Sequence, residues 1–141
     1  MEIVTASIFS PGTGAAEVYA DQVHVASRTG LLAVAEAPGG SQEGRAAVRM
    51  ALDTVRAHVE RNEDVLDRFR RNPTSDLRKR VLTTIEEGFA RAAQEVFAFA
   101  RRREGVSVTM DVCLLLGSEA FIGHVGDGRV YLVRRGLVHQ L

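Results

Sequence analysis

The stretch VTMDVCLLLGSEAFIGHVGDGRV, residues 108–130, predicts a β-hairpin from which the rest of the fold can be built outward. Gly117 and Ser118 are typical of a tight turn, and residues 120–125 run back from them as a second strand. Apolar residues alternate along the first strand and share one face: Val108, Met110, Val112, Leu114 and Leu116. We therefore expect an antiparallel pair with one face against a core.

Short strand-like segments lie on both sides of this hairpin. Upstream, apolar patterns punctuated by glycine predict strands at residues 3–9, 22–26 and 31–35. Downstream, the same signals predict strands at residues 130–133 and 137–141, joined by a turn at residues 134–136. Most strands are thus separated by short turns, which favours antiparallel pairing.

Two helices are expected between these strand groups. From Glu43, apolar residues recur at three- and four-residue spacing through Val59, and Ser41 is placed to cap the helix start. Residues 61–72 extend that first helix. After Pro73 a second apolar stripe runs from Leu77 to Ala100, with Thr74 or Ser75 as the N-cap and Gly105 as the stop. No βαβ alternation occurs, so the pattern predicts an α+β fold: an antiparallel sheet or sandwich with two long helices on one face.

Composition narrows the class of protein. The chain has 141 residues, 45% of them hydrophobic, which suits a single domain over residues 1–141. The 18 basic and 18 acidic side chains cancel, so we expect neither nucleic acid nor an anionic membrane as partner. One cysteine and no apolar leader predict a cytoplasmic protein. Lys79 is the sole lysine among the basic residues, a bias that we attribute to a bacterial genome.

Two acidic turns are candidates for chemistry. AVAEAPGGSQEG, residues 33–44, places Glu36 just past a strand and a glycine pair before a helix start. A carboxylate there can bind a hard cation, and the free N–H groups of a helix start can bind an anion. HVGDGRV, residues 124–130, places Asp127 in a second glycine-rich turn. Taken separately, the two motifs are better explained as an ordinary strand-loop-helix joint and an ordinary turn than as a binding site.

Together and in this order, the two motifs and the hairpin resemble the N-terminal half of the PPM (type 2C) metal-dependent Ser/Thr protein phosphatases. That family reads Val-Ala-Asp-Gly-Met-Gly-Gly at the first turn, Gly-Thr-Thr before the central hairpin, and Gly-Asp-Ser-Arg where this chain has Gly126-Asp127-Gly128-Arg129. The resemblance extends over nearly all of the chain. It implies two Mg²⁺ or Mn²⁺ ions that hold the water attacking phosphoserine or phosphothreonine.

The resemblance carries metal ligands over to particular residues. Glu36 aligns with the metal-bridging Asp of the family, and the backbone carbonyl of Ala37 aligns with that of the following Gly. Asp21 matches an upstream Asp, and Asp127 matches the acid near a third metal. Four further positions match the structural part of the motifs: Gly39, Gly40, Gly126 and Arg129. These residues define the metal site that the resemblance implies.

The same alignment shows losses. Ala20 stands where the family has a metal-binding Glu, and Ala16 stands where it has the phosphate-holding Arg, so no phosphate-binding residue is assigned. Glu36 is one methylene longer than Asp, and Pro38 restricts the backbone of Ala37. The Asp residues that complete the family's metal centre belong to its C-terminal half, beyond residue 141. We therefore expect a catalytically impaired module, a pseudophosphatase that binds a phosphoprotein or signalling partner.

Two alternatives remain open at this point. One is an active Mg²⁺- or Mn²⁺-dependent phosphatase whose C-terminal half is absent here or supplied by another chain. The other is a structural dimerisation module, because a strand at residues 137–141 would leave an unpaired edge that recruits a second copy or a partner strand.

Other polar residues in the strands and helices are expected to be structural. The four histidines have no partner at metal-ligand spacing, and Cys113 is expected to be a buried, inert thiol. Asp111 lies in the central strand, and the sequence leaves open whether it faces solvent or pairs with an arginine such as Arg129.

Overall fold

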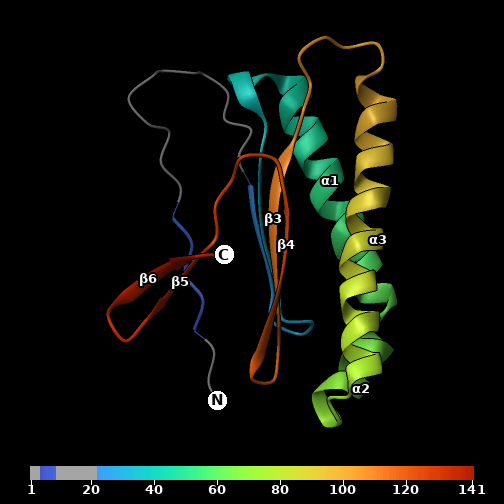
Figure 1. Cartoon of the computed structure of the whole chain (residues 1–141). Helices are drawn as coiled ribbons and strands as arrows, with labels where there is room; N and C mark the ends of the chain where they lie inside the picture. Colours follow the sequence, from blue (N-terminus) through green and yellow to red (C-terminus); the bar gives the residue numbers. More distant parts are fainter. Residues whose placement is uncertain (1–3, 9–21) are drawn as a thin grey trace.

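The computed structural model describes residues 4–8 and 22–141. Four strands form one antiparallel sheet in the order β1-β2-β3-β4, and two more form a separate hairpin. The elements are β1 Gln22–Ala26, β2 Leu31–Glu36, the short 3₁₀ helix η1 Pro38–Gly40, α1 Gln42–Arg61, α2 Glu63–Arg71, α3 Ser75–Ala100, β3 Thr109–Leu116, β4 Glu119–Val125, β5 Tyr131–Arg134 and β6 Leu137–Gln140. Figure 1 shows the helices together on one side of the four-stranded sheet.

The predicted α+β fold is confirmed, and the central hairpin forms as expected. β3 pairs with β4 on one edge and with β2 on the other, so the helices are inserted between two neighbouring strands of one sheet. The strand expected at residues 3–9 is wrong for its described part, because residues 4–8 form no strand. They lie instead beside Val23 and Leu32, over the sheet face that is turned away from the helices.

The helices start as their caps predict but divide differently. The Ser41 hydroxyl accepts the N–H of Gly44 at 2.9 Å, and the Thr74 hydroxyl accepts that of Leu77 at 3.3 Å. Of residues 61–72, which were expected to extend the first helix, only Arg61 belongs to α1, because the chain leaves helical geometry at Asn62 (φ −103°, ψ 18°) and starts α2.

α3 ends well before the expected stop at Gly105. Its last residue is Ala100, and the Arg103 guanidinium donates to the carbonyl of Phe99 while lying 4.0 Å from the centre of the Phe99 ring. An arginine thus satisfies a carbonyl that the end of the helix leaves open.

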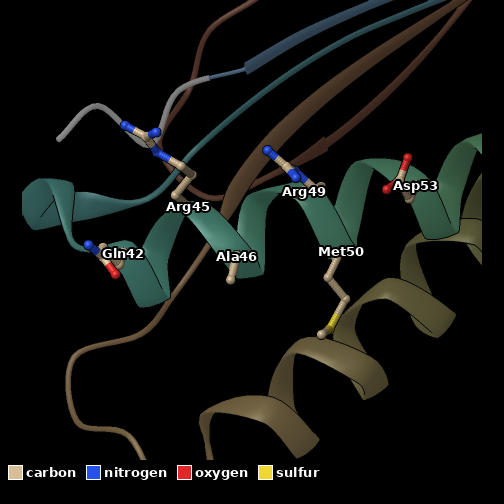
Figure 2. A pocket seen from close by; sticks show the side chains of 6 residues that line it. All are labelled: Gln42, Arg45, Ala46, Arg49, Met50 and Asp53. Atoms are coloured by element: carbon tan, nitrogen blue, oxygen red, sulfur yellow. The ribbon is translucent and has the colours of Figure 1, made fainter.

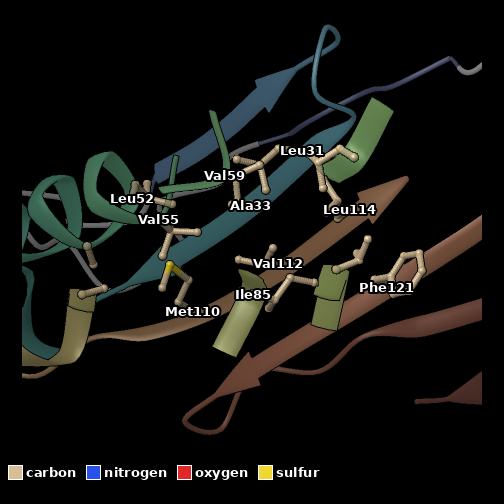
Figure 3. Packing of buried hydrophobic residues seen from close by; sticks show 14 of the residues in the cluster. Leu31, Ala33, Leu52, Val55, Val59, Ile85, Met110, Val112, Leu114 and Phe121 are labelled. Carbon is tan, nitrogen blue, oxygen red and sulfur yellow. The ribbon is translucent and has the colours of Figure 1, made fainter. Parts of the chain in front are cut away.

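The core lies between the sheet and the helices (Figure 3). The alternation predicted for the central strand is correct, since Met110, Val112, Leu114 and Leu116 are all buried. α2 contributes Phe69, whose ring meets that of Phe121 edge-on at 5.3 Å. The burial of this one face places every second residue of β3 and β4 on the opposite, outer face of the sheet.

Residues 4–8 lie over part of the outer face, and in the described part of the chain several apolar side chains of that face and of the β5–β6 hairpin remain exposed. Val23, Val25 and Val34 are 44%, 42% and 49% exposed. The hairpin lies apart from the helices (Figure 1), and its turn uses Arg135 and Gly136 at φ 53° and 77°. In the described part of the chain, no helix has both the length and the apolar character needed to cross a bilayer.

Candidate functional site

Glu36 lies at one end of the sheet, within β2 and not just past the strand as the sequence pattern predicted. It is the last residue of β2 and stands opposite Thr109, the first residue of β3. The Thr109 hydroxyl donates to the Glu36 carboxylate at 3.1 Å, and the Glu36 side chain is exposed. The carboxylate is therefore tied to the neighbouring strand while it remains open to solvent.

The segment after Glu36 turns the chain from the sheet into α1. Ala37 is buried and extended (φ −129°, ψ 134°), and Pro38 starts η1. Gly39 has φ 81°, a conformation that strongly favours glycine. Because the Ser41 hydroxyl already accepts an N–H of the first turn of α1, the helix start is partly satisfied before any anion arrives.

The Gly126–Arg129 turn lies at the same end of the sheet as Glu36. Gly126 has φ 104°, and a Cβ placed on it would collide with the Thr109 side chain. Thr109 thus touches this turn and also donates to Glu36, which brings the two acidic motifs to one end of the sheet. Asp127 is exposed, and its charge is one cause that raises the pKa of His124.

An aspartate and a histidine form a close pair on the outer face, near this end of the sheet. Oδ1 of Asp111 is 2.6 Å from Nδ1 of His124, and Nε2 of His124 is 2.8 Å from the carbonyl oxygen of Gly126. The pKa of His124 is raised, first by its hydrogen bond to Asp111. Asp111 therefore pairs with a histidine, and not with Arg129 or with solvent alone.

The predicted metal ligands are only partly brought together. Glu36 and Asp127 lie at the same end of the sheet, whereas Asp21 lies outside the described residues. Among residues 4–8 and 22–141, no three His, Cys, Asp or Glu side chains gather as ligands of one ion. Mg²⁺ requires a near-octahedral set of oxygens. The two predicted carboxylate ligands at this end of the sheet are Glu36, which Thr109 holds, and the exposed Asp127. By themselves they do not fit a two-metal centre.

Sequence analysis missed the roles of Thr109, Asp111 and His124. A signal for the last two was present, because counting back equally from the turn at Gly117 and Ser118 pairs Asp111 with His124. The same count pairs Thr109 with Gly126, whereas the contact of Gly128 with Asp111 had no such signal, since it depends on how the turn folds back over the strand.

Other candidate groups are structural. Cys113 is half-buried, and burial raises the pKa of its thiol, which disfavours the reactive thiolate. His58 is buried between helices, where Nε2 lies 3.3 Å from the Glu87 carboxylate.

A hollow of about 500 Å³ runs along α1 (Figure 2). Arg45 and Arg49 point to the same side of the helix, whereas Met50 points toward α3. Among the described residues that line it, Asp53 is the one acid and forms an ion pair with Arg56 at 3.0 Å. This hollow is basic, so it does not add ligands for a cation.

Comparison with known proteins places this fold. No family model matches the chain. The chain is 28% identical over 121 residues to the serine/threonine protein phosphatase PstP of Mycobacterium tuberculosis, in strains CDC 1551 / Oshkosh and ATCC 25618 / H37Rv. The match covers 86% of this chain and 21% of each relative. The chain is thus a distant homologue of PstP and spans about a fifth of its length.

Solved structures agree with this homology. The crystal structure of M. tuberculosis PstP/Ppp superposes with a TM-score of 0.68 at 22% identity, over 90% of this chain and 48% of that one. PppA, a regulatory component of T6SS in Pseudomonas aeruginosa, gives 0.67 at 23%, over 88% and 49%. The PstP catalytic domain in complex with two manganese ions gives 0.60 at 24%, over 90% and 50%. The described fold is therefore that of about half of a PPM-type phosphatase chain.

Proposed function

We propose that this chain is a PPM phosphatase-like module with impaired catalysis, a pseudophosphatase that acts by binding a phosphoprotein or signalling partner. The observation that carries the proposal is the state of Glu36. It replaces the shorter metal-bridging Asp that the family resemblance implies, and its carboxylate accepts a hydrogen bond from Thr109 at 3.1 Å. Metal-centre chemistry tolerates displacements of only a fraction of an ångström, so an added methylene disfavours the bridge.

Neighbouring residues support the same proposal. The extended Ala37 backbone and the following Pro38 limit how the adjacent carbonyl can turn toward an ion. Ala16 and Ala20 provide neither the positive charge nor the carboxylate that the resemblance places upstream.

Hydrolysis of a phosphothreonine peptide in Mn²⁺ tests the proposal. We expect no turnover by the purified chain above a metal-only blank, with the PstP catalytic domain as the positive control. Metal-dependent turnover that Glu36→Ala abolishes would refute the pseudophosphatase proposal. A Glu36→Asp variant serves as the matched control, because it keeps the charge and restores the shorter side chain.

An active phosphatase is the second candidate, favoured by the presence of the Glu36 and Asp127 motifs at the same end of the sheet, on either side of Thr109. In this case further acidic ligands come from a segment outside these 141 residues. Co-expression with a downstream segment of a PstP-like phosphatase should then restore Mn²⁺-dependent turnover, and Asp127→Ala should remove it again. Continued inactivity of the purified complex would argue against this candidate.

Dimerisation through the strand at residues 137–141 is the third candidate function. An isolated two-stranded hairpin is marginally stable in water, and β6 carries no formally charged residue of the kind that protects exposed edges. We propose that β6 pairs with β6 of a second copy. Light scattering should show a dimer at micromolar concentration, and Val138→Lys should dissociate it. A monomer whose β6 amides are nonetheless protected from hydrogen exchange would contradict this pairing.

A further inference from the structure

Two outward-facing residues of β3 support the turn that carries Asp127. Thr109 and Asp111 are two positions apart on the strand, so both point to the outer face. A Cβ built on Gly126 would collide with Thr109, and a Cβ built on Gly128 would collide with Oδ2 of Asp111. Alternate residues of the strand therefore lie directly against alternate residues of the turn.

Asp111 is itself held in place. Asp111 and His124 are directly opposed across the β3–β4 pair, and Oδ1 lies 2.6 Å from Nδ1. The other ring nitrogen faces the Gly126 carbonyl at 2.8 Å. Both ring nitrogens thus face acceptors, and an imidazole can donate to two acceptors only when both nitrogens carry a proton.

The two carboxylate oxygens of Asp111 consequently have different neighbours. Oδ1 accepts a hydrogen bond from Nδ1–H of His124. Oδ2 lies beside the Cα of Gly128, in the space that a side chain at position 128 would need. His124 closes the arrangement, since it joins the strand carboxylate to the first residue of the turn.

We propose that Asp111 is a positioning residue: fixed by His124, it sets the Gly126–Arg129 turn, and with it the Asp127 carboxylate, and it restricts position 128 to glycine. The part of this inference that concerns Asp127 rests on the proposed phosphatase-like site. The coupling between Asp111 and position 128 does not. The type 2C pattern has serine at this place, so the chain has replaced that serine by the one residue that leaves room for the Asp111 carboxylate.

A double-mutant cycle on Asp111 and Gly128 tests the proposal. Gly128→Ser should lower the folding equilibrium constant about tenfold or more in the wild-type background, because it drives a side chain into the carboxylate. In the Asp111→Ala background the same substitution should cost several-fold less. Gly117→Ser is the matched control, since a Cβ there meets nothing within 4 Å, and it should cost the same in both backgrounds.

The protonation state of the His124 ring is a second readout. It would not change if Asp111 had a purely structural role. In the wild type at neutral pH, ¹⁵N NMR should show both nitrogens protonated. Gly128→Ser and Asp111→Ala should each shift His124 toward its neutral form, whereas Asp111→Asn should retain the Nδ1–H bond in part. If Asp111→Ala does not fold, Asp111→Ser, which also removes the carboxylate from the space beside Gly128, takes its place in the cycle.

Equal losses in both backgrounds, or an unchanged His124 signal in Gly128→Ser, would overturn the coupling. Neither readout involves a metal or a phosphopeptide, so this result is independent of whether the chain has phosphatase activity.

Discussion

Oδ1 of Asp111 lies 2.6 Å from Nδ1 of His124, across the β3–β4 pair and beside the turn that carries Asp127. This contact joins the central strand to the candidate site, because the same imidazole also reaches the Gly126 carbonyl. It has consequences for pH dependence that differ in sign from those of the buried His58.

The first prediction concerns the pKa of His124. It is raised above the ordinary value of 6.5, chiefly by the hydrogen bond to Asp111. A raised folded-state pKa means that the contribution of this pair to stability is complete below about pH 6.5 and is lost as pH rises through the folded-state pKa. NMR titration should show the raised value, and Asp111→Asn should lower it. An unchanged pKa in Asp111→Asn would assign the shift to other charges.

His58 should show the opposite dependence. Burial, followed by the charge of Arg91, lowers its pKa below the ordinary 6.5. Stability from neutral His58 is therefore complete above about pH 6.5 and is lost as pH falls through the folded-state pKa. Urea unfolding should show this loss on acidification, and His58→Gln should reduce it. His139→Gln is the control, because that histidine lies on the exposed β6 strand.

Gly30 should not tolerate a side chain. It has φ 78°, a Cβ there would collide with the backbone carbonyl oxygen of Leu115, and its own carbonyl accepts the Leu115 N–H at 2.9 Å. Gly30→Ala should cost about 3 kcal/mol or more in urea unfolding, since strain and collision add. Gly117→Ala, at φ 63° with nothing within 4 Å, should cost about 1 kcal/mol. Similar losses for both would show that the collision is relieved.

Phe69 should be the main anchor of α2. It is 1% exposed and meets Phe121 edge-on, whereas Phe97 of α3 is 70% exposed. Phe69→Ala should lower the unfolding free energy by about 3–5 kcal/mol, because it leaves a cavity. Phe97→Ala should change it by no more than about 0.5 kcal/mol. The comparison fails if both variants unfold at the same urea concentration.

Calorimetric titration with Mn²⁺ distinguishes a pseudophosphatase from an active phosphatase. With Glu36 tied to Thr109 and Asp127 exposed on its turn, we expect no saturable binding below millimolar metal. Asp127→Asn, which keeps the shape and removes the charge, should then give the same trace. Saturable binding that Asp127→Asn abolishes would instead support an active site completed by further residues.

The buried face of the central strand and the helix starts were predictable because they depend on short-range patterns. The alternation around Val112 identified the buried face of the central strand, and the caps at Ser41 and Thr74 located two helix starts. The break at Asn62 and the end of α3 at Ala100 were not predictable, since neither position carries a proline or glycine signal. At both places packing and side-chain caps outweigh local propensity.

The sequence alone determined the α+β class, the register of the central hairpin and the resemblance to type 2C phosphatases, because periodicity, turn residues and motif order are written along the chain. Tertiary structure decided which groups meet. Thr109 lies between Glu36 of β2 and Gly126 after β4, and Asp111 lies against Gly128, where the turn folds back over β3. Such contacts depend on the distances between elements, and hydrophobic periodicity carries no information on those distances.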